Sequence, residues 1–217
     1  MKRLLLLVAL LMSVGGVVAQ TNPYYESRVE LFNQMPIHSN DIVFLGNSIT
    51  DRCEWSEFFS NRHIKNRGID GDRADWMLER LDNLVAAHPK KLFLLVGIND
   101  LMQGRQAEQV AQSVDQILKR FETESPWTKI YVQSIFPVNG VDTTPQHPEW
   151  VANQVIQQTN ALLEELCKER KNIFYVDVFS ALVNDRGLLD SRYTNDGIHL
   201  TGRGYMVWKE VIEKFVK

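Results

Sequence analysis

The sequence predicts an α/β fold in which helices cover both faces of a parallel sheet. Two observations lead to this fold class. Compact apolar runs alternate with amphipathic stretches from residue 24 to residue 216, and turn-forming residues separate them. Strand–helix alternation of this kind is typical of parallel sheets buried on both sides. A composition with 44% hydrophobic and 24% charged residues can fill the core of one such domain.

The first half of the chain predicts three helices and three strands. A leading helix is expected at 24–34. The run Ile-Val-Phe-Leu at 42–45 predicts a buried strand, and a helix at 54–60 follows it. A short strand is expected at 64–66, ending at Gly68. Residues 72–87 predict an amphipathic helix, and a third strand is expected at 91–96. The helix rests on apolar residues at helical spacing: Met77, Leu78, Leu81, Leu84 and Val85.

The second half continues the alternation. Helices are expected at 107–121, 149–170 and 202–216, and strands at 129–135 and 173–176. Right-handed crossovers in a doubly wound sheet place the helices at 54–60 and 202–216 on one face. The helices between them then cover the other face. Cys53 and Cys167 belong to opposite faces in this arrangement, so we expect two free, mostly buried thiols and no disulfide.

The N-terminal segment has the pattern of a secretory signal peptide at 1–19. Lys2 and Arg3 precede an apolar core at 4–12, and small residues end at Ala19, where cleavage is expected. An uncleaved membrane anchor is the alternative, although the apolar core is short for a spanning helix. We therefore expect a secreted or periplasmic protein with a single domain at 20–217 and no membrane span after cleavage.

Charge and composition exclude several partner classes. The formal net charge is -3, and no basic run follows the leader, which argues against a nucleic-acid or anionic-membrane partner. The histidines at 38, 63, 88 and 147 are scattered singly, without metal-ligand spacing. We expect neither a metal nor another cofactor.

Polar residues follow the predicted strands at the points where each strand ends. These stretches are 46–48, 66–72 and 97–100, and a further polar stretch at 196–200 precedes the last helix. Because the carboxyl ends of parallel strands meet at one edge of a sheet, we expect the four stretches to converge. Together they supply a serine, a histidine, an aspartate, an asparagine and turn glycines, which suffice for acyl transfer.

The chemistry of acyl transfer assigns a role to each of these residues. Ser48 needs a proton acceptor before it can attack an ester, and His199 can serve. Asp196, three residues earlier, can fix the imidazole tautomer. The backbone N–H groups of Ser48 and Gly71 and the side-chain amide of Asn99 are candidate donors to the tetrahedral oxyanion.

Each of these residues also has a purely structural explanation. Ser48 or Thr50 can cap a helix, and Gly68 and Gly71 can permit tight turns. Asn99 can form a turn, and Asp196-Gly197 is an ordinary turn dipeptide. The joint occurrence of all of them at strand exits favours a catalytic site.

The four blocks resemble those of the SGNH hydrolase family, also called GDSL esterases and lipases. The matching stretches are Gly46-Asn47-Ser48-Ile49, Asn66 to Gly71, Gly97-Ile98-Asn99-Asp100 and Asp196-Gly197-Ile198-His199-Leu200. The resemblance implies a flavodoxin-like, three-layer α/β/α sandwich with five parallel strands in the order 2-1-3-4-5. It also implies a metal-independent serine esterase with the triad Ser48, His199 and Asp196.

The resemblance further implies an oxyanion hole made by Ser48, Gly71 and Asn99, with Gly68 left to the turn. The first block reads Gly-Asn-Ser-Ile instead of Gly-Asp-Ser-Leu, and position 47 carries no triad role. This variant resembles the branch that includes platelet-activating-factor acetylhydrolase catalytic subunits and bacterial acetylesterases. The branch favours short acyl groups, acetyl above all.

The substrate pocket is the least specified feature. Trp55, Met102 and Trp150 are candidates to line it, and the segment 137–150 is either a lid or a plain surface excursion. Trp150 can also be a packed helix residue.

We expect a small-molecule or glycan ester as substrate. The alternatives are a lysophospholipase, thioesterase or arylesterase, or a non-catalytic glycan-binding protein, and a phosphate- or flavin-binding protein is weaker still. The protein is expected to be a monomer or a homodimer.

Overall fold

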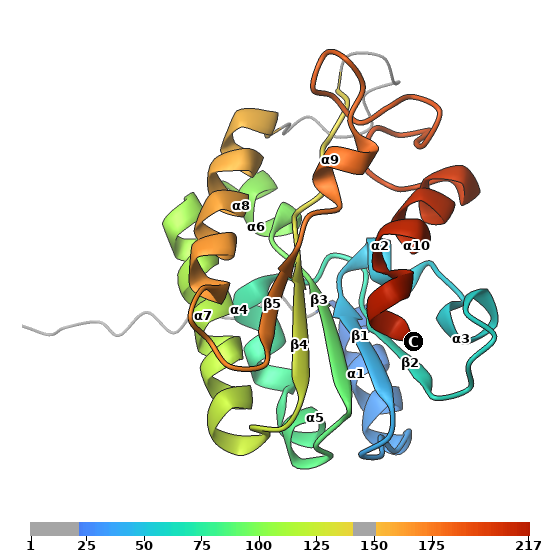
Figure 1. The fold of residues 1–217 in the computed structure, drawn as a ribbon, viewed down its shortest axis with the longest axis vertical. Coiled ribbons are helices and arrows are strands. Elements are labelled where there is room, and N and C mark those ends of the chain that lie inside the picture. The colour runs from blue at the N-terminus through green and yellow to red at the C-terminus, as the bar shows by residue number, and fades with distance from the viewer. Residues whose placement is uncertain (1–21, 141–150) are drawn as a thin grey trace, which may run out of the picture.

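The computed structural model describes residues 22–140 and 151–217. The predicted signal peptide at 1–19 and most of the 137–150 segment fall outside these ranges and stay predictions. The described chain forms three layers, with a sheet between two sets of helices (Figure 1). The sheet has five parallel strands in the order β2-β1-β3-β4-β5, as predicted. The strands are β1 (Ile42–Gly46), β2 (Ile64–Gly68), β3 (Lys91–Leu95), β4 (Lys129–Gln133) and β5 (Ile173–Val176).

The strand register places the ends of the first three strands side by side. Gly46 pairs with Gly68 on one side and with Leu95 on the other. The loops that leave β1, β2 and β3 therefore start at the same height on one edge of the sheet. Every residue of β1 and β3 is buried, because these central strands are covered on both faces.

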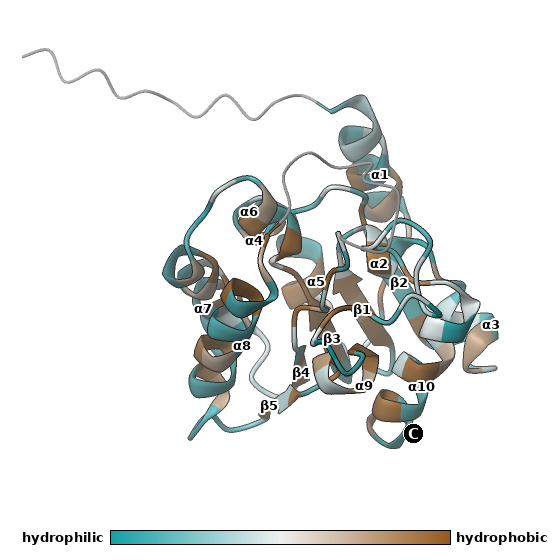
Figure 2. Ribbon diagram, turned by 90° about the horizontal axis from the view of Figure 1, so that it is seen from above, coloured by the Kyte–Doolittle hydropathy of each residue, from teal (hydrophilic) through white to brown (hydrophobic). Residues whose placement is uncertain are grey.

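The helices that the doubly wound order assigns to each face lie as predicted. The helices on one face include α3 (Trp55–Phe58) and α10 (Gly202–Val216), and those on the other include α7 (Ala107–Glu124) and α8 (Asn153–Cys167) (Figures 1 and 2). Cys53 and Cys167 are both buried and free, as expected.

An aromatic layer fills the space between the sheet and the α3/α10 face. Phe44 stacks on Trp55 at a ring-centroid distance of 4.2 Å and on Phe93 at 4.7 Å. Trp208 of α10 meets Trp55 edge-on at 4.6 Å and donates from its indole nitrogen to Gln133 Oε1. Both tryptophans are among the fully buried side chains. This layer makes the sheet edge above it a rigid platform.

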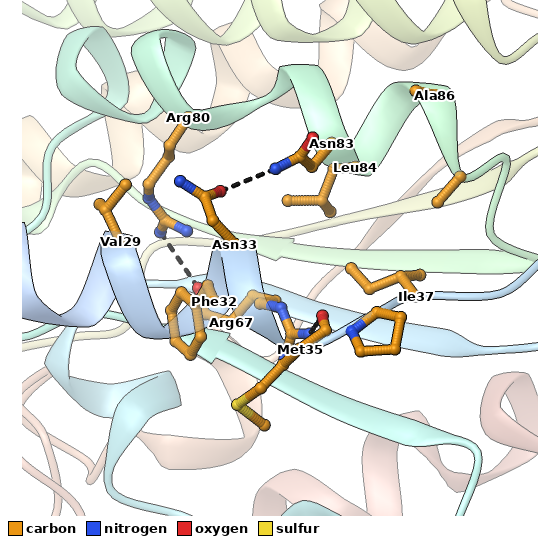
Figure 3. Close-up of a pocket in the computed structure, with 12 residues that line it drawn as sticks. Val29, Phe32, Asn33, Met35, Ile37, Arg67, Arg80, Asn83, Leu84 and Ala86 are labelled. Atoms are coloured by element: carbon orange, nitrogen blue, oxygen red, sulfur yellow. Dashed lines mark hydrogen bonds between the residues drawn. The ribbon is translucent and has the colours of Figure 1, made fainter.

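The leading helix α1 (Pro23–Gln34) lies along β2, although none of its residues is fully buried. Phe32 packs under the guanidinium of Arg67, and Arg67 donates to the carbonyl of Met35, which caps the helix. A cavity of about 310 Å³ remains between α1, β2 and α5 (Asp82–Ala86) (Figure 3).

One helix prediction was wrong, and three short helices were not predicted. The helix expected at 72–87 is broken into α4 (Ala74–Met77), a 3₁₀ turn η1 (Leu78–Arg80) and α5. Its apolar positions are mostly buried as predicted, because successive short turns satisfy the same spacing as one helix. The short helices α2 (Ser48–Asp51), α6 (Ile98–Met102) and α9 (Phe179–Leu182) were not predicted. Four or five residues are too few to show a helical period.

Candidate active site

Ser48 lies directly beyond the carboxyl end of β1, as the first residue of α2. Asn47 is the N-cap of this helix, and its Oδ1 accepts the backbone N–H of Ile49. The N–H of Ser48 is one of those that a helix leaves without an intrahelical partner. Ser48 therefore presents both a hydroxyl and an N–H at the sheet edge, and its side chain is held in a buried position.

The short helix α2 is fixed by side chains from three other elements. Asn66 of β2 places its Nδ2 at 3.0–3.1 Å from the carbonyls of Thr50, Asp51 and Cys53. The indole of Trp55 donates to the carbonyl of Thr50, and the hydroxyl of Tyr205 donates to that of Ile49. These bonds satisfy carbonyls that such a short helix cannot satisfy itself.

The prediction that Trp55 lines the substrate pocket was wrong. Its side chain is 1% exposed, stacks on Phe44 beneath the sheet and bonds to the carbonyl of Thr50. An indole in the aromatic layer cannot contact a substrate above the sheet edge. The sequence around Trp55 did not distinguish an indole in the substrate pocket from one in the aromatic layer.

The loop before α10 holds Asp196 and His199. Asp196 Oδ1 accepts the backbone N–H groups of Ile198 and His199 at 3.0 and 2.8 Å. Its other oxygen, Oδ2, lies 2.6 Å from His199 Nδ1. Burial raises the pKa of the Asp196 carboxyl, but the bonds from the His199 ring and from the two N–H groups outweigh it and lower the pKa to about 2. The carboxylate is thus ionised throughout the neutral range.

The structure brings the three predicted catalytic residues into one hydrogen-bonded chain. His199 Nε2 lies 2.9 Å from Ser48 Oγ, across 151 positions of sequence. Asp196 holds the opposite ring nitrogen. This is the geometry in which a hydroxyl can give its proton to a neutral imidazole whose orientation is fixed by a carboxylate.

The three candidate oxyanion donors come from the loops after β1, β2 and β3. Gly71 adopts φ +78°, a conformation that favours glycine, and no atom lies within 4 Å of where a Cβ would stand. Asn99 lies in α6 and donates from Nδ2 to the carbonyl of Asp72 at 2.8 Å. An amide carries two N–H donors, so one bond to the loop leaves a second for a ligand. Asn99 therefore contacts the same loop that carries Gly71.

Gly68, which the resemblance left to the turn, is instead the last residue of β2, and its role is in close packing. A Cβ at Gly68 would lie 2.2 Å from the backbone nitrogen of Asp51. The glycine thus allows α2 to pack directly against the end of β2, which brings the loops after β1 and β2 together.

Two buried carboxylates, each next in sequence to a candidate oxyanion donor, were not assigned a role from the sequence. Asp72 is fully buried and pairs with Arg80 at 2.5 Å. Asp100 is also fully buried, accepts the N–H of Ala74 and pairs with Arg105 at 2.8 Å. Burial raises the pKa of Asp100 to about 6, although the Ala74 N–H and Arg105 oppose it. No local sequence pattern marks these pairs, because the partners meet only in the folded chain.

The remaining predicted contacts are placed only in part. Met102 is half-buried at the end of α6 and packs against the core. Trp150 lies outside the described residues. The described start of the 137–150 segment is anchored, because the backbone N–H of Asn139 donates to the carbonyl of Gly197 in the histidine loop.

Residues 22–140 and 151–217 contain no cluster of three acidic, histidine or cysteine side chains suited to a metal ion. Within the same ranges, no helix has both the length and the apolar character to span a bilayer.

Comparisons with known proteins find matches over most of the chain. The model of the GDSL-like lipase/acylhydrolase family matches residues 44–207. The chain is 30% identical over 175 residues to platelet-activating factor acetylhydrolase IB subunit alpha2 of Rattus norvegicus, a match that covers 76% of this chain and 71% of that protein.

Solved structures share the fold. A structure from Streptococcus pneumonia, provisionally described as that of a platelet activating factor, superposes with a TM-score of 0.83 at 28% identity and covers 90% of this chain and 94% of that one. An acetylxylan esterase from Geobacillus stearothermophilus shows the same fold, with a TM-score of 0.63 at 16% identity, over 82% of this chain and 94% of that one.

Proposed function

Because the chain belongs to the GDSL-like lipase/acylhydrolase family and is a carboxylic ester hydrolase, we propose that it cleaves short-chain O-esters, chiefly acetyl esters, with Ser48 as nucleophile. The hydrogen-bonded chain from Ser48 through His199 to Asp196 carries this proposal. A serine hydroxyl attacks an ester only when a base takes its proton, and His199 Nε2 is within reach of that proton.

The proposed reaction has two halves. Ser48 Oγ attacks the carbonyl carbon while its proton passes to His199 Nε2, and the carbonyl oxygen becomes an oxyanion. As this intermediate collapses, the bond to the alcohol breaks and His199 returns the proton to the leaving alcohol oxygen. Water then attacks the acyl-enzyme through the same base, and the carboxylic acid leaves with Ser48 restored.

The charges of the site suit each step. Asp196 is ionised at neutral pH, so it stabilises the imidazolium that forms when His199 accepts the proton. The N–H groups of Ser48 and Gly71 and the Asn99 amide are the proposed donors to the oxyanion. Loss of one such donor costs about 3 kcal/mol of transition-state stabilisation in enzymes of this kind.

We propose carbohydrate acetyl esters as the substrate class. The predicted leader, which favours an extracellular protein, and the shared fold with an acetylxylan esterase support this choice. A lipid ester is the second candidate, because the curated relatives are named for hydrolysis of platelet-activating factor. Both candidates involve the same acyl-transfer chemistry, so they differ in the group that the leaving-group pocket accepts.

The test is hydrolysis of p-nitrophenyl esters from acetate to laurate by the wild type and by Ser48→Ala. We expect activity confined to the short esters and a loss of about 10³-fold or more in the variant, because alanine lacks the hydroxyl that lies against His199 Nε2. Ser180→Ala, at an exposed serine in α9, is the matched control and should keep full activity. Acetate release from acetylated xylan should then be compared with release from an acetylated glycerophospholipid.

Equal rates for wild type and Ser48→Ala would remove Ser48 as nucleophile. A profile that peaks at laurate would keep the mechanism and contradict the acetyl preference. Acetate release from the phospholipid alone would replace the carbohydrate by the lipid candidate.

A further inference from the structure

The loop that carries Gly71 is followed by a buried ion pair between Asp72 and Arg80. Arg80 approaches one carboxylate oxygen twice, with Nη2 at 2.5 Å and Nε at 2.9 Å from Asp72 Oδ2. The side chain of Arg80 is 4% exposed and that of Asp72 is 0% exposed. The other oxygen, Oδ1, accepts the backbone N–H of Arg73. A charge pair buried this deeply must be held by exact partners, since each ion alone is costly to remove from water.

Arg80 also joins the ends of two strands. Its Nη2 lies 3.0 Å from the carbonyl of Arg67, near the end of β2, and 3.3 Å from the carbonyl of Gly46, at the end of β1. Figure 3 shows the Arg80 side chain reaching towards Arg67 from the 3₁₀ turn η1. One guanidinium therefore contacts the β1 end that leads to Ser48, the β2 end and the residue after Gly71.

The two backbone donors lie close in sequence to these contacts. Ser48, which carries one of the two N–H donors, is two residues after Gly46. Gly71, which carries the other, directly precedes Asp72. The only covalent route between them runs through α2, α3 and β2. Arg80 gives a direct link, so it fixes the separation of the two donors more tightly than the chain does.

The same loop is also held by α6. Asn99 donates to the carbonyl of Asp72, and Asp100 accepts the N–H of Ala74 at 3.0 Å. With bonds to Arg80 and to α6, residues 72–74 have little freedom to move. Gly71 has no side chain to hold it in place, so its position must be set by the adjoining residues 72–74.

We propose that the Asp72–Arg80 pair is a positioning device that sets the Gly71 N–H relative to the Ser48 N–H and thereby shapes the oxyanion hole. This inference rests on the proposed function. Within the described residues, Arg80 bonds to Asp72, Gly46 and Arg67 and to no member of the triad. Its contribution to the reaction is indirect, and the pair should act as a unit.

The experiment measures kcat and KM for p-nitrophenyl acetate in Arg80→Ala, Arg80→Lys, Asp72→Asn and the double variant Asp72→Asn/Arg80→Ala. Misplacement of a donor by about 1 Å reduces kcat by about 100-fold, so we expect that loss in Arg80→Ala with KM changed less than about threefold. Arg80→Lys keeps the charge but cannot reach all three oxygen partners, so its kcat should be intermediate. The double variant should be no slower than the slower single variant, because the two residues act together.

Thermal unfolding of each variant shows whether it is folded at the assay temperature. Arg120→Ala is the matched control, because Arg120 forms ion pairs with Asp82 and Glu124 at the surface, and it should keep wild-type kinetics. If Arg80→Ala does not fold, Arg80→Lys and Asp72→Asn decide the question.

A kcat within twofold of wild type in the folded variants would overturn the proposal, as would losses in the two single variants that multiply in the double variant. A KM that rises by the factor by which kcat/KM falls would place the pair in substrate binding and also overturn it.

Failure of this inference is separable from failure of the proposed function. If Ser48→Ala is inactive while the Arg80 variants are unimpaired, the esterase mechanism stands and the positioning role is wrong. If Ser48→Ala keeps full activity, the proposed function itself is wrong.

Discussion

Asp196 holds both the backbone of the loop that carries His199 and the imidazole ring of that histidine. Its Oδ1 holds the backbone of the loop through the N–H groups of Ile198 and His199, and its Oδ2 holds the ring of His199. The same three bonds keep the carboxylate ionised despite its partial burial. The loop geometry and the proposed electrostatic role therefore have a common origin.

Asp196→Asn separates these two roles. The amide oxygen can keep the backbone bonds, but its NH₂ group faces His199 Nδ1 and favours the tautomer with the proton on Nε2, which cannot accept a proton from Ser48. We expect kcat for p-nitrophenyl acetate to fall by about 10⁴-fold with KM nearly unchanged.

Asp190→Asn is the control for Asp196→Asn. Asp190 lies in the same loop region, pairs with Arg192 and makes no contact with the His199 ring. It should keep wild-type kinetics. A fall of less than tenfold in Asp196→Asn would contradict the assigned role of this carboxylate.

At the scale of elements, the nucleophile depends on a helix of only four residues. Isolated helices of this length do not form in water, and α2 persists because Asn66, Trp55 and Tyr205 bond to its carbonyls. It also lies directly against the end of β2, where Gly68 offers no side chain. The position of Ser48 is therefore set by neighbours of α2 more than by α2 itself.

Gly68→Ala tests this dependence. The new methyl carbon would lie 2.2 Å from the nitrogen and 2.6 Å from the Cα of Asp51, both backbone atoms, so α2 must move. We expect a loss of stability of about 1–3 kcal/mol in denaturant unfolding and a fall in kcat larger than the change in KM. Both effects follow from displacement of the helix that begins at Ser48.

Gly202→Ala is the matched substitution, because open space surrounds its Cβ position at the start of α10. It should leave stability and kcat near wild type. Wild-type kcat in a folded Gly68→Ala variant would show that Ser48 tolerates movement of α2.

At the scale of the whole molecule, buried charge makes stability depend on pH. The pKa of Asp100 is raised to about 6 by burial in the folded protein, against about 4 in an unfolded chain. Between these values the folded state binds more protons, so the free energy of unfolding falls as pH rises from about 4 to about 6. The difference between the two pKa values corresponds to about 3 kcal/mol in total, of which about 2 kcal/mol is lost between pH 4 and pH 6, because the carboxyl is half-titrated at each end of this window. Asp196, whose pKa is lowered, acts in the opposite direction and below this window.

Asp100→Asn should remove this contribution. We expect the wild type to lose about 2 kcal/mol more than the variant between pH 4 and pH 6 in urea unfolding. The comparison concerns the slope, since loss of the bond to Arg105 also changes the absolute stability. Asp185→Asn, at an exposed position, should keep the wild-type slope. Parallel pH profiles for wild type and Asp100→Asn would contradict a raised pKa at Asp100.

The sequence by itself determined which apolar runs form strands and which residue types follow them, and the resemblance to the SGNH hydrolase family implied the sheet order. Ser48, Asp196 and His199 could be chosen because few residue types can act as nucleophile, base and orienting acid, and because parallel strands end at one edge. The closing helix, Gly202–Val216, was predicted at its observed bounds, since a long amphipathic segment shows its period clearly.

Only the tertiary structure decided which residues support that site. Asp72 meets Arg80, Asp100 meets Arg105 and Asn66 meets α2 through side-chain contacts that leave no periodic pattern in the sequence. The same limit applies to Trp55, whose position in the core follows from the rings that stack on it. Periodicity reports which face of an element is apolar, whereas the partner of a buried polar group depends on how several elements pack together.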